Sequence, residues 1–492
     1  MDSGFAVHNF VMSKMVHLFR MGELNIALDV NSASVHVVDD EVSSMLEVLS
    51  PLMEGTPKKR EILLNALAKN IRRYSRAELS EALDEILELK EQGKLFSEDP
   101  YEKDLEDFGK RETVVKALCL HVAHDCNLSC RYCFAGEGEY HGERGLMSLE
   151  TGKKALDFLV KASGSRRNLE VDFFGGEPLL NFGVVKELVA YGRSLEKENN
   201  KNFRFTITTN GVLLDDEKME FINKEMDNLV LSIDGRKEVH DRMRPFKGGQ
   251  DKDISCYDMI LPKLLKAAKS REEAGKQYYV RGTYTRFNTD FSKDVLHLAD
   301  LGFTQISMEP VVASPKEPYS LRKADMAELL SEYEALAKEF LARKKGEKPF
   351  HFFHFMIDLE GGPCIYKRLT GCGAGSEYLS VTPEGSLYPC HQFAGEPQFL
   401  LGNVNDGVQN TALVEQFKSV NVYAKPECRK CFAKLYCSGG CMANSYHHTG
   451  SVTEIYEEMC VLQRRRVECA VYIKAMESLK QKEEDEEGVA AK

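Results

Sequence analysis

Three cysteines that lie close together in the sequence have the clearest potential for chemistry. They are spaced Cys126-x3-Cys130-x2-Cys133 and follow an apolar segment. Three thiolates on a four-iron, four-sulfur cluster leave one iron atom open, whereas an ordinary electron-transfer cluster takes four cysteines. A structural zinc site also takes four ligands, and zinc is the main alternative. The spacing therefore predicts a [4Fe–4S] cluster that binds an additional ligand at its open iron.

A second group of cysteines lies toward the C-terminus. Disulfides are rare in a reducing cytosol, and short cysteine spacings point instead to metal. A zinc ribbon is the main rival, but zinc takes four ligands per ion and the number of cysteines here suits two interleaved sites. Cys119, Cys256 and Cys469 fall outside the groups and are expected to pack in the core. The grouped residues are Cys364, Cys372, Cys390, Cys428, Cys431, Cys437, Cys441 and Cys460.

Small and polar residues follow several predicted strands and could surround a ligand. Glycines let a ligand approach the backbone closely, a carboxylate such as Glu177 can pair with an ammonium group, and hydroxyls suit a ribose. Taken alone, each segment is equally well explained as a turn or a helix cap. Arg281, inside the fifth predicted strand, is expected to be a buried charge that needs an anion. The segments are Gly175-Gly176-Glu177, Thr208-Thr209-Asn210, Ser232-Ile233-Asp234 and Ile306-Ser307-Met308-Glu309.

Strands and helices that alternate along the chain must position these residues. This order is typical of an α/β fold with a parallel sheet, either open or closed as a barrel. Functional side chains of such folds lie at the carboxyl ends of the strands, where the segments above occur. Helices are predicted between the strands, for example at 149–162 and 183–198. The predicted strands are 114–122, 169–174, 203–209, 228–233, 279–285 and 304–309.

The 492 residues are too many for one compact core, so several domains are expected. Residues 1–100 contain an alternating segment, 17–38, followed by three helical patterns near 40–55, 58–72 and 76–94, which predicts a winged-helix-like domain. The remaining predicted units are a charged linker at 101–111, the strand–helix region at 112–320, a helical connector at 321–360, a cysteine-rich domain at 361–478 and a disordered acidic tail at 479–492.

The overall charge and hydropathy exclude some classes of function. A net charge of −12 argues against a nucleic-acid binder, which usually has a basic face. The sequence contains no apolar run long enough to cross a bilayer. Polar residues such as His8, Asn9 and Lys14 interrupt the N-terminal segment, so it does not resemble a secretory signal. We therefore expect a cytoplasmic protein with no membrane partner.

The first cysteine group resembles the CxxxCxxC signature of the radical SAM superfamily. The resemblance implies a partial (β/α)6 TIM-like barrel whose cluster, held by Cys126, Cys130 and Cys133, cleaves S-adenosylmethionine (SAM) to a 5′-deoxyadenosyl radical. The Gly-Gly-Glu segment resembles the family motif that holds the SAM amino group, and Arg281 would meet the SAM carboxylate. The residues that the resemblance places at SAM are Gly175, Gly176, Glu177, Thr209, Ser232, Asp234, Arg281 and Met308.

The C-terminal cysteines resemble those of a SPASM domain, which carries two auxiliary [4Fe–4S] clusters, making three clusters in all. By that resemblance, one auxiliary cluster is held by Cys428, Cys431, Cys437 and Cys460. The other is held by Cys372, Cys390 and Cys441, with Cys364 as a candidate fourth ligand. Without Cys364, an open iron would remain for a substrate thiolate.

The chain as a whole resembles maturases of the SCIFF peptide (six cysteines in forty-five residues). The resemblance rests on the strand around Leu24–Asn31, the Gly371-Cys372-Gly373 segment and the Pro389-Cys390-His391-Gln392 segment. It implies an oxidoreductase that joins a Cys sulfur to a carbon of another residue in a ribosomally made, cysteine-rich precursor peptide. The N-terminal domain would bind the leader of that peptide by strand addition. A flavodoxin- or ferredoxin-type donor would supply electrons.

Two other functions remain as alternatives. One is a different SPASM-type modification, such as a carbon–carbon crosslink or the side-chain oxidation of sulfatase maturation. Sulfatase-maturing enzymes of this group carry an Asp directly after the cysteine that matches Cys390, whereas this chain has His391, which could act as a base. The other alternative is an iron–sulfur electron carrier or scaffold without catalytic activity. The polar strand ends argue against it, because a carrier has no use for a SAM pocket.

Overall fold

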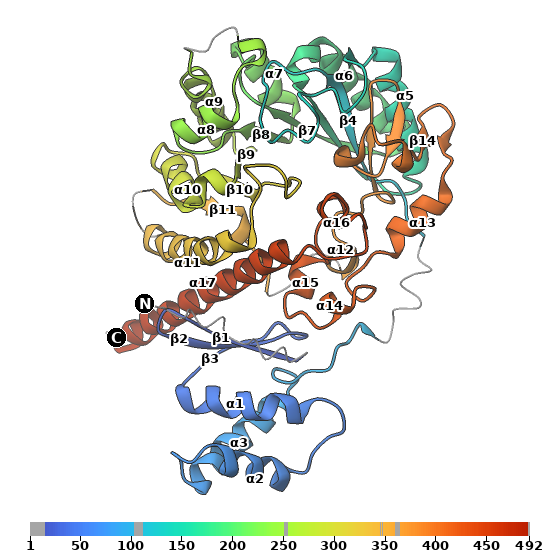
Figure 1. Ribbon diagram of the computed structural model, residues 1–492. Coiled ribbons are helices and arrows are strands. Elements are labelled where there is room, and N and C mark those ends of the chain that lie inside the picture. Colours follow the sequence, from blue (N-terminus) through green and yellow to red (C-terminus); the bar gives the residue numbers. More distant parts are fainter. Residues whose placement is uncertain are drawn as a thin grey trace.

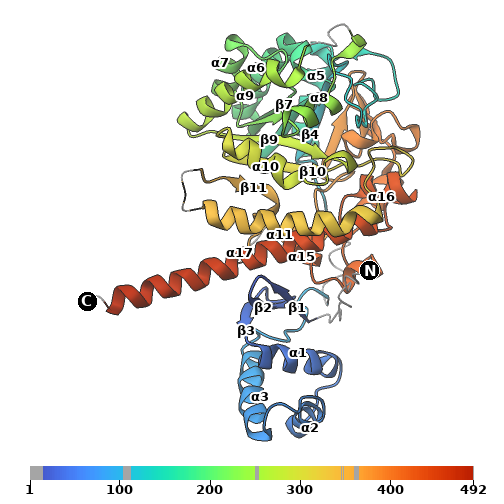
Figure 2. The same ribbon diagram turned by 60° about the vertical axis from the view of Figure 1, so that its left-hand side comes forward.

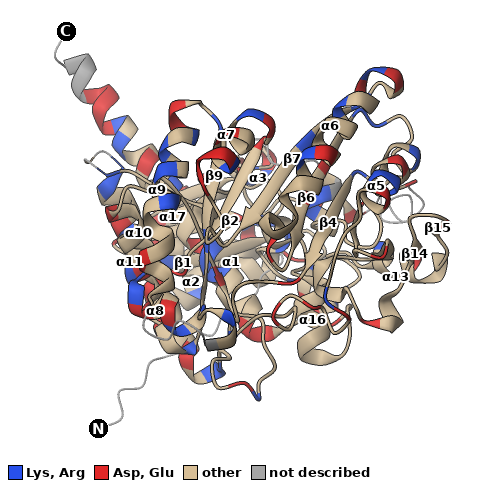
Figure 3. Cartoon of the chain, turned by 90° about the horizontal axis from the view of Figure 1, so that it is seen from above, with Lys and Arg blue, Asp and Glu red and all other residues tan. Residues whose placement is uncertain are grey.

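The computed structural model describes residues 15–102, 112–249, 254–344, 346, 348–359 and 365–490 (Figures 1 and 2). Most of the predicted linker at 101–111 and the whole of Cys364 lie outside these ranges. Among the described residues, no helix combines the length and the apolar character that a membrane crossing requires. Along the helices around the sheet, Lys and Arg are interspersed with Asp and Glu (Figure 3).

The N-terminal unit is a three-stranded antiparallel sheet followed by three helices; its winged-helix-like character stays a prediction. The strands pair in the order β1-β2-β3. Ser75 begins the third helix with a capping box, in which its hydroxyl and the Glu78 carboxylate bind each other's backbone amides. Leucines such as Leu46 and Leu79 form a core separate from the main one. The elements are β1 (Val16–Met21), β2 (Leu24–Asp29), β3 (Val35–Val38), α1 (Asp40–Met53), α2 (Arg60–Asn70) and α3 (Arg76–Glu91).

The central unit is a parallel sheet wrapped by helices, and all six predicted strands are confirmed. They pair in the order β10-β9-β8-β7-β6-β4, and the sheet continues into β11 at one edge and β12 at the other instead of closing on itself. The strands are β4 (Ala117–His124), β6 (Asn168–Gly175), β7 (Asn202–Thr209), β8 (Asn228–Ser232), β9 (Gln277–Tyr284), β10 (Gln305–Pro310), β11 (His351–Phe352) and β12 (Tyr378–Val381), and the short β5 (Gly145–Leu146) pairs with β4.

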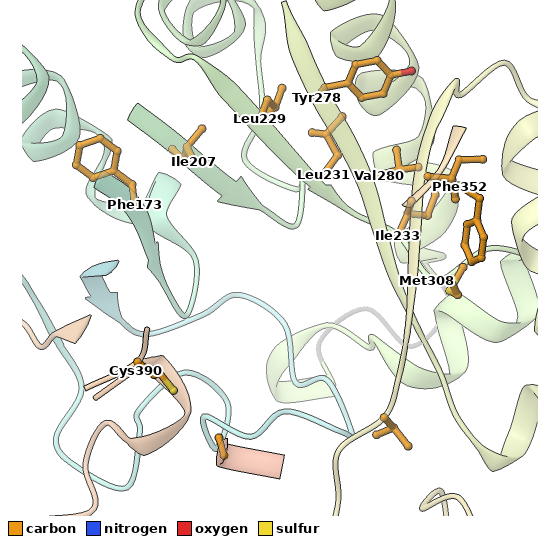
Figure 4. Packing of buried hydrophobic residues seen from close by; sticks show 14 of the residues in the cluster. Phe173, Ile207, Leu229, Leu231, Ile233, Tyr278, Val280, Met308, Phe352 and Cys390 are labelled. Carbon is orange, nitrogen blue, oxygen red and sulfur yellow. The ribbon is translucent and has the colours of Figure 1, made fainter. Parts of the chain in front are cut away.

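Alternation along the strands builds the core between the sheet and its helices. Buried side chains from neighbouring strands, including Phe173, Ile207 and Leu231, lie in a row across the sheet (Figure 4). The residues between them face the opposite, concave side of the sheet. The helices are α5 (Leu149–Ala162), α6 (Phe182–Asn199), α7 (Asp216–Glu225), α8 (Lys237–Met243), α9 (Cys256–Glu273), α10 (Phe291–Asp300) and α11 (Met326–Arg343).

The C-terminal unit is formed by short elements and one long helix, α17. This helix packs on α11 and passes between the barrel and the N-terminal sheet (Figures 1 and 2). The elements are β13 (Ser386–Tyr388), β14 (Gly402–Asn403), β15 (Gly407–Val408), α12 (Ile365–Thr370), α13 (Thr411–Ser419), α14 (Pro426–Arg429), α15 (Lys434–Cys437), α16 (Met442–Thr449) and α17 (Glu457–Ala490).

The predicted disordered tail is wrong for most of its length, because α17 continues to Ala490. The tail is rich in Lys, Gln and Glu, which favour helices once the preceding turns have formed. Gln481 also donates a hydrogen bond to Asp485 one turn later, at 2.9 Å. The acidic composition that suggested disorder is therefore compatible with the exposed end of a packed helix.

Two polar contacts fix the N-terminal unit on the C-terminal one. His17 on β1 bonds Glu468 on α17 at 3.0 Å, and both side chains are buried. Asp99, after α3, accepts hydrogen bonds from Lys434 at 2.6 Å and from Tyr423 at 2.8 Å. Burial alone would raise the pKa of Asp99, but these two donors hold it below its usual value.

We predict that Asp99→Asn loosens this junction. The substitution keeps the shape of the side chain but leaves the buried Lys434 ammonium without a counter-charge, and breaking a buried pair in this way costs about 3–5 kcal/mol. Hydrogen exchange of the amides at 97–102, followed by mass spectrometry, should become at least about a hundredfold faster. Glu102→Gln is the control, because its ion pair with Arg429 is half exposed and is worth about 0–1 kcal/mol. Equal protection in the two variants would contradict the prediction.

Candidate active site

A cavity of about 430 Å³ lies at the carboxyl ends of the parallel strands. It collects most of the strand-end residues that the sequence singled out, and the cysteine loop after β4 forms part of its wall. Cysteines of the C-terminal unit line it as well, from segments more than 300 residues away in the chain. The predicted residues that line the cavity are Cys126, Cys130, Cys133, Gly175, Gly176, Glu177, Thr209, Ser232, Arg281, Cys437, Cys441 and Cys460.

The cysteine loop is held in place by the segment that follows α8. Ser129 and Arg131 donate their backbone amides to the carbonyls of Pro245 and Met243, each at 2.9 Å. Lys247 then donates to the Cys126 carbonyl at 3.2 Å and pairs with Asp125 at 2.5 Å. This segment, 243–247, supports the loop through contacts between distant parts of the chain, which sequence spacing does not encode.

Asp234 is the centre of this support and does not face the cavity. Its carboxylate accepts hydrogen bonds from the Tyr132 hydroxyl at 2.6 Å and from Arg244 at 3.0 Å through two nitrogens. It also accepts from the backbone amide of Thr283 on β9 at 3.0 Å. With 0% exposure, Asp234 has no free edge for SAM. The structure therefore gives Asp234 a role in positioning the loop instead of the expected contact with SAM. It acts through Tyr132, which lies between two of the loop cysteines.

Glu177 reaches the cavity wall, but its oxygens already have partners. They accept hydrogen bonds from the backbone amides of Leu179 and Asn210 and from the Thr209 hydroxyl, at 2.8–3.0 Å. Burial nevertheless raises the pKa of Glu177 to about 7. A cation bound in the cavity would favour the ionised form and lower this pKa again.

Gly175 and Gly176 let β6 approach the cysteine loop. A Cβ atom at Gly175 would lie 2.3 Å from the Ala123 carbonyl oxygen, and one at Gly176 would lie 2.1 Å from the Asp125 oxygen. The amides of Gly176 and Glu177 donate to these same two carbonyls. The sequence suggested close approach of a ligand as the reason for these glycines, and the structure adds close approach of the protein's own loop.

Arg281 and Met308 differ from expectation in opposite ways. Arg281 was predicted to be buried, but its side chain is exposed into the cavity and has no ion pair or hydrogen bond among the described residues. Met308 is fully buried, because its neighbour Glu309 faces the cavity and successive side chains of a strand point to opposite faces. The structure therefore leaves only the backbone of Met308 near the site.

Aromatic and histidine rings form a layer behind the cysteine loop that the sequence did not reveal. His121 and His124 lie 3.1 Å apart through their ring nitrogens, and both rings pack on Tyr140. His391 lines the cavity, with ring centroids 5.3 Å from Phe134 and 5.0 Å from Phe174. Burial, and to a lesser extent the charge of Arg281, lowers the pKa of His391 to about 4, so its ring is neutral near pH 7.

The C-terminal cysteines lie close together, and their division into two ligand sets stays a prediction from the resemblance. Cys428, Cys431, Cys437 and Cys460 together line a separate small cavity of about 30 Å³. Burial and the nearby Cys441, Cys372 and Cys119 thiols raise the pKa of Cys390 well above its usual value. Cys390 belongs to the same buried cluster as Phe173 and Ile207 of the barrel strands (Figure 4).

These positions fit the implied cofactors. Three cysteines open onto a cavity large enough for a small ligand, and four others enclose a small space, as expected for a cluster with an open iron and for one that is fully ligated. Within the described part of the chain, no three His, Cys, Asp or Glu side chains are grouped around a single metal ion. Cysteines that hold a cube bind different iron atoms, so they need not meet at one point.

Gly176→Ala should disrupt the first cysteine site. The new methyl group would force Asp125 away from β6, and overpacking of this kind costs about 1–3 kcal/mol. We expect lower stability in urea and less iron per chain after anaerobic reconstitution. Gly183→Ala on α6 is the matched control, because nothing lies within 4 Å of its Cβ position. Unchanged iron content and stability in Gly176→Ala would show that the loop tolerates displacement.

Glu177 should give the metal-free protein a distinct pH dependence. Because its pKa is raised from 4.5 to about 7 on folding, the native state binds the extra proton in this window. The free energy of unfolding should therefore fall as the pH rises from about 4.5 to 7, by up to about 3 kcal/mol from this group. Urea unfolding across this range should show a shallower fall for Glu177→Gln, whereas the exposed control Glu187→Gln should follow the unmodified protein. A slope equal to that of the unmodified protein in Glu177→Gln would exclude this assignment.

Comparison with known proteins agrees with this geometry. Residues 120–254 match the profile of the Radical SAM superfamily, and residues 372–432 match that of an iron–sulfur cluster-binding domain, SPASM. An uncharacterized protein of Methanocaldococcus jannaschii is 28% identical over 65% of this chain and 99% of its own length. The PqqA peptide cyclase of Gluconobacter oxydans is 25% identical over 72% of this chain and 93% of its own.

The fold is shared with a solved structure, native anSMEcpe with bound AdoMet. The two chains superpose with a TM-score of 0.56 at 19% sequence identity, over 72% of this chain and 97% of the other. The profiles and this fold cover the barrel and the cysteine-rich unit described above. The chain therefore has a mixed α/β radical SAM fold followed by a SPASM iron–sulfur cluster-binding domain.

Proposed function

We propose that this chain is a radical SAM enzyme that forms Cys thioether crosslinks in a cysteine-rich precursor peptide. One observation carries the proposal: cysteines of the barrel loop and of the C-terminal unit face the same cavity. A peptide residue in that cavity would be close to both Cys133 and Cys441. The arrangement suits a reaction in which a carbon is attacked at one site while a sulfur is held at another.

The chain's own residues would bind and orient SAM at the barrel end. When bound, the cluster at Cys126, Cys130 and Cys133 would supply the electron that cleaves SAM. Arg281, whose guanidinium has no partner among the described residues, is suited to the SAM carboxylate. The hydroxyls of Thr209 and Ser232 line the same wall and suit the ribose. The main chain around Met308 would meet the adenine, since its side chain points away.

The architecture of the N-terminal unit favours a peptide as the substrate. Its sheet is three-stranded and antiparallel, and β1 and β3 are the edge strands within it. An extended peptide can add to such an edge through backbone hydrogen bonds. His17 and Asp99 attach this unit to the C-terminal unit, so a bound leader would be tethered beside the cavity. We propose this sheet as the leader-binding surface.

A different peptide modification is the second candidate. One relative is named a PqqA peptide cyclase, and a ring-forming modification of a peptide is therefore the alternative. Sulfatase maturation is less well supported, because His391 replaces the acidic residue expected after Cys390. Mass spectrometry of the reduced product separates these outcomes, because a thioether combines a loss of two hydrogens with a peptide cysteine that stays closed to alkylation after treatment with a reductant.

The test is anaerobic reconstitution with iron and sulfide, followed by SAM, a reductant and a cysteine-rich precursor peptide. Each thioether replaces one S–H and one C–H bond by a C–S bond, so the peptide should lose two hydrogen atoms per crosslink. Cys126→Ala should abolish both 5′-deoxyadenosine and the crosslink. Cys256→Ala, which alters a buried cysteine outside both cavities, should retain both.

The outcomes separate the levels of the proposal. Formation of 5′-deoxyadenosine with an unchanged peptide mass would contradict thioether formation and leave SAM cleavage standing. A loss of two hydrogens with every cysteine still open to alkylation would favour a carbon–carbon crosslink. No 5′-deoxyadenosine in the reconstituted protein would favour the electron carrier or scaffold.

A further inference from the structure

Lys425 is a buried ammonium group that has no acidic partner among the residues that the structure describes. Its side chain is 1% exposed, and no Asp or Glu carboxylate of the described residues lies within ion-pair distance. The amine donates only to two backbone carbonyls, of Gly439 at 3.0 Å and of Glu454 at 3.4 Å. The neighbouring Lys434 is also buried, but Asp99 neutralises it. Lys425 is therefore a positive charge that no carboxylate in the described part of the chain compensates.

Such a charge is costly unless something negative is bound nearby. Burying an isolated ammonium is strongly unfavourable even after the protein relaxes around it, so buried lysines are normally paired. The acidic groups that face Lys425 are the thiols of Cys428 and Cys441. Burial raises the pKa of Cys428 to about 12, and the charge of Lys425 acts against that rise. It acts in the same direction on Cys441.

Arg464 brings a second positive charge to the same cysteines. It lies on α17, one turn after Cys460, and lines the cavity formed by the four cysteines. Its guanidinium is close enough to bond the Cys431 sulfur, and its Nε is buried without another partner among the described residues. Glu457, which pairs with Arg464 at 2.9 Å, is more than half exposed. The contact of Arg464 with the buried Cys431 thiol therefore outweighs its contact with the Glu457 carboxylate.

We propose that Lys425 and Arg464 are buried counter-charges that raise the reduction potential of the four-cysteine cluster. A [4Fe–4S] cluster with four thiolates carries net negative charge, and reduction adds one more. Positive charge and hydrogen bonds to the sulfurs stabilise the reduced form. Lys425 also acts on Cys441 of the other set, but Arg464 acts on Cys431 and Cys460.

The four-cysteine cluster would also lie beside the space in which the reaction takes place. Cys437 and Cys460 line both the four-cysteine cavity and the main cavity, so this cluster would border the reaction space. Where the proposed function holds, a thioether leaves one hydrogen atom on the deoxyadenosyl group, one proton in solution and one electron to be removed. A raised reduction potential would suit the cluster held by Cys428, Cys431, Cys437 and Cys460 to take up that electron.

The test is a potentiometric titration of the full, cluster-loaded chain, followed by electron paramagnetic resonance. Arg464→Gln should shift the midpoint of one auxiliary cluster to more negative potential, and Lys425→Met should shift that same midpoint and, through Cys441, the other auxiliary midpoint as well. The midpoint of the SAM-binding cluster should stay unchanged. Glu457→Gln should shift the same midpoint in the opposite direction, because it removes the negative charge beside Arg464. Lys474→Met, an exposed cation farther along α17, is the control and should shift none.

The measurement needs neither peptide nor turnover, so it is independent of the thioether proposal. If Lys425→Met fails to retain its iron, Arg464→Gln and Glu457→Gln, whose side chains lie nearer the surface, still decide the matter. Unchanged midpoints in both of these variants at full iron content would overturn the proposal. A shift of the same size in Lys474→Met would also overturn it, by showing an effect of net charge alone.

Discussion

The buried carboxylate of Asp234 connects the parts of the barrel on which the site depends. It receives Tyr132 from the cysteine loop, Arg244 from the segment after α8 and the Thr283 amide from β9. Each of these contacts brings a separate stretch of chain to the end of β8. A carboxylate without exposed surface must have its partners in place, because an unpaired buried charge is strongly destabilising. The geometry of the cysteine loop thus depends on the hydrogen bonds that the Asp234 carboxylate accepts.

A second constraint acts at the C-terminal side, where α17 contacts every unit. The helix begins near Cys460, places Arg466 beside Glu309 on β10 and continues to Glu468, which bonds His17 of the N-terminal sheet. Cluster ligands, the cavity wall and the domain junction therefore share one rigid element. A helix is a rigid element, so Cys460 at the start of α17 is held in a fixed position relative to the barrel.

The differences between sequence expectation and structure have specific physical causes. Asp234 has the residue type and spacing of a ligand contact, but Arg244 and Tyr132 lie where they can neutralise it. Met308 lies on the expected strand, β10, but its side chain points away from the cavity, whereas that of the next residue, Glu309, faces it. Arg281 was expected to be buried because it lies in a central strand, yet an open cavity exposes that face. The tail looked disordered by composition, although the packed turns before it nucleate a helix.

The sequence by itself determined the local chemistry: the cysteine spacings, the six parallel strands and the polar residues at their ends. These features repeat or cluster over short distances, so they are visible without coordinates. Only the tertiary structure decided that Cys133 and Cys441 face one cavity, that Asp234 supports the loop and that Lys425 has no acidic partner among the described residues. Such facts depend on contacts between segments tens to hundreds of residues apart. Burial and charge compensation arise from those contacts, and no local pattern records them.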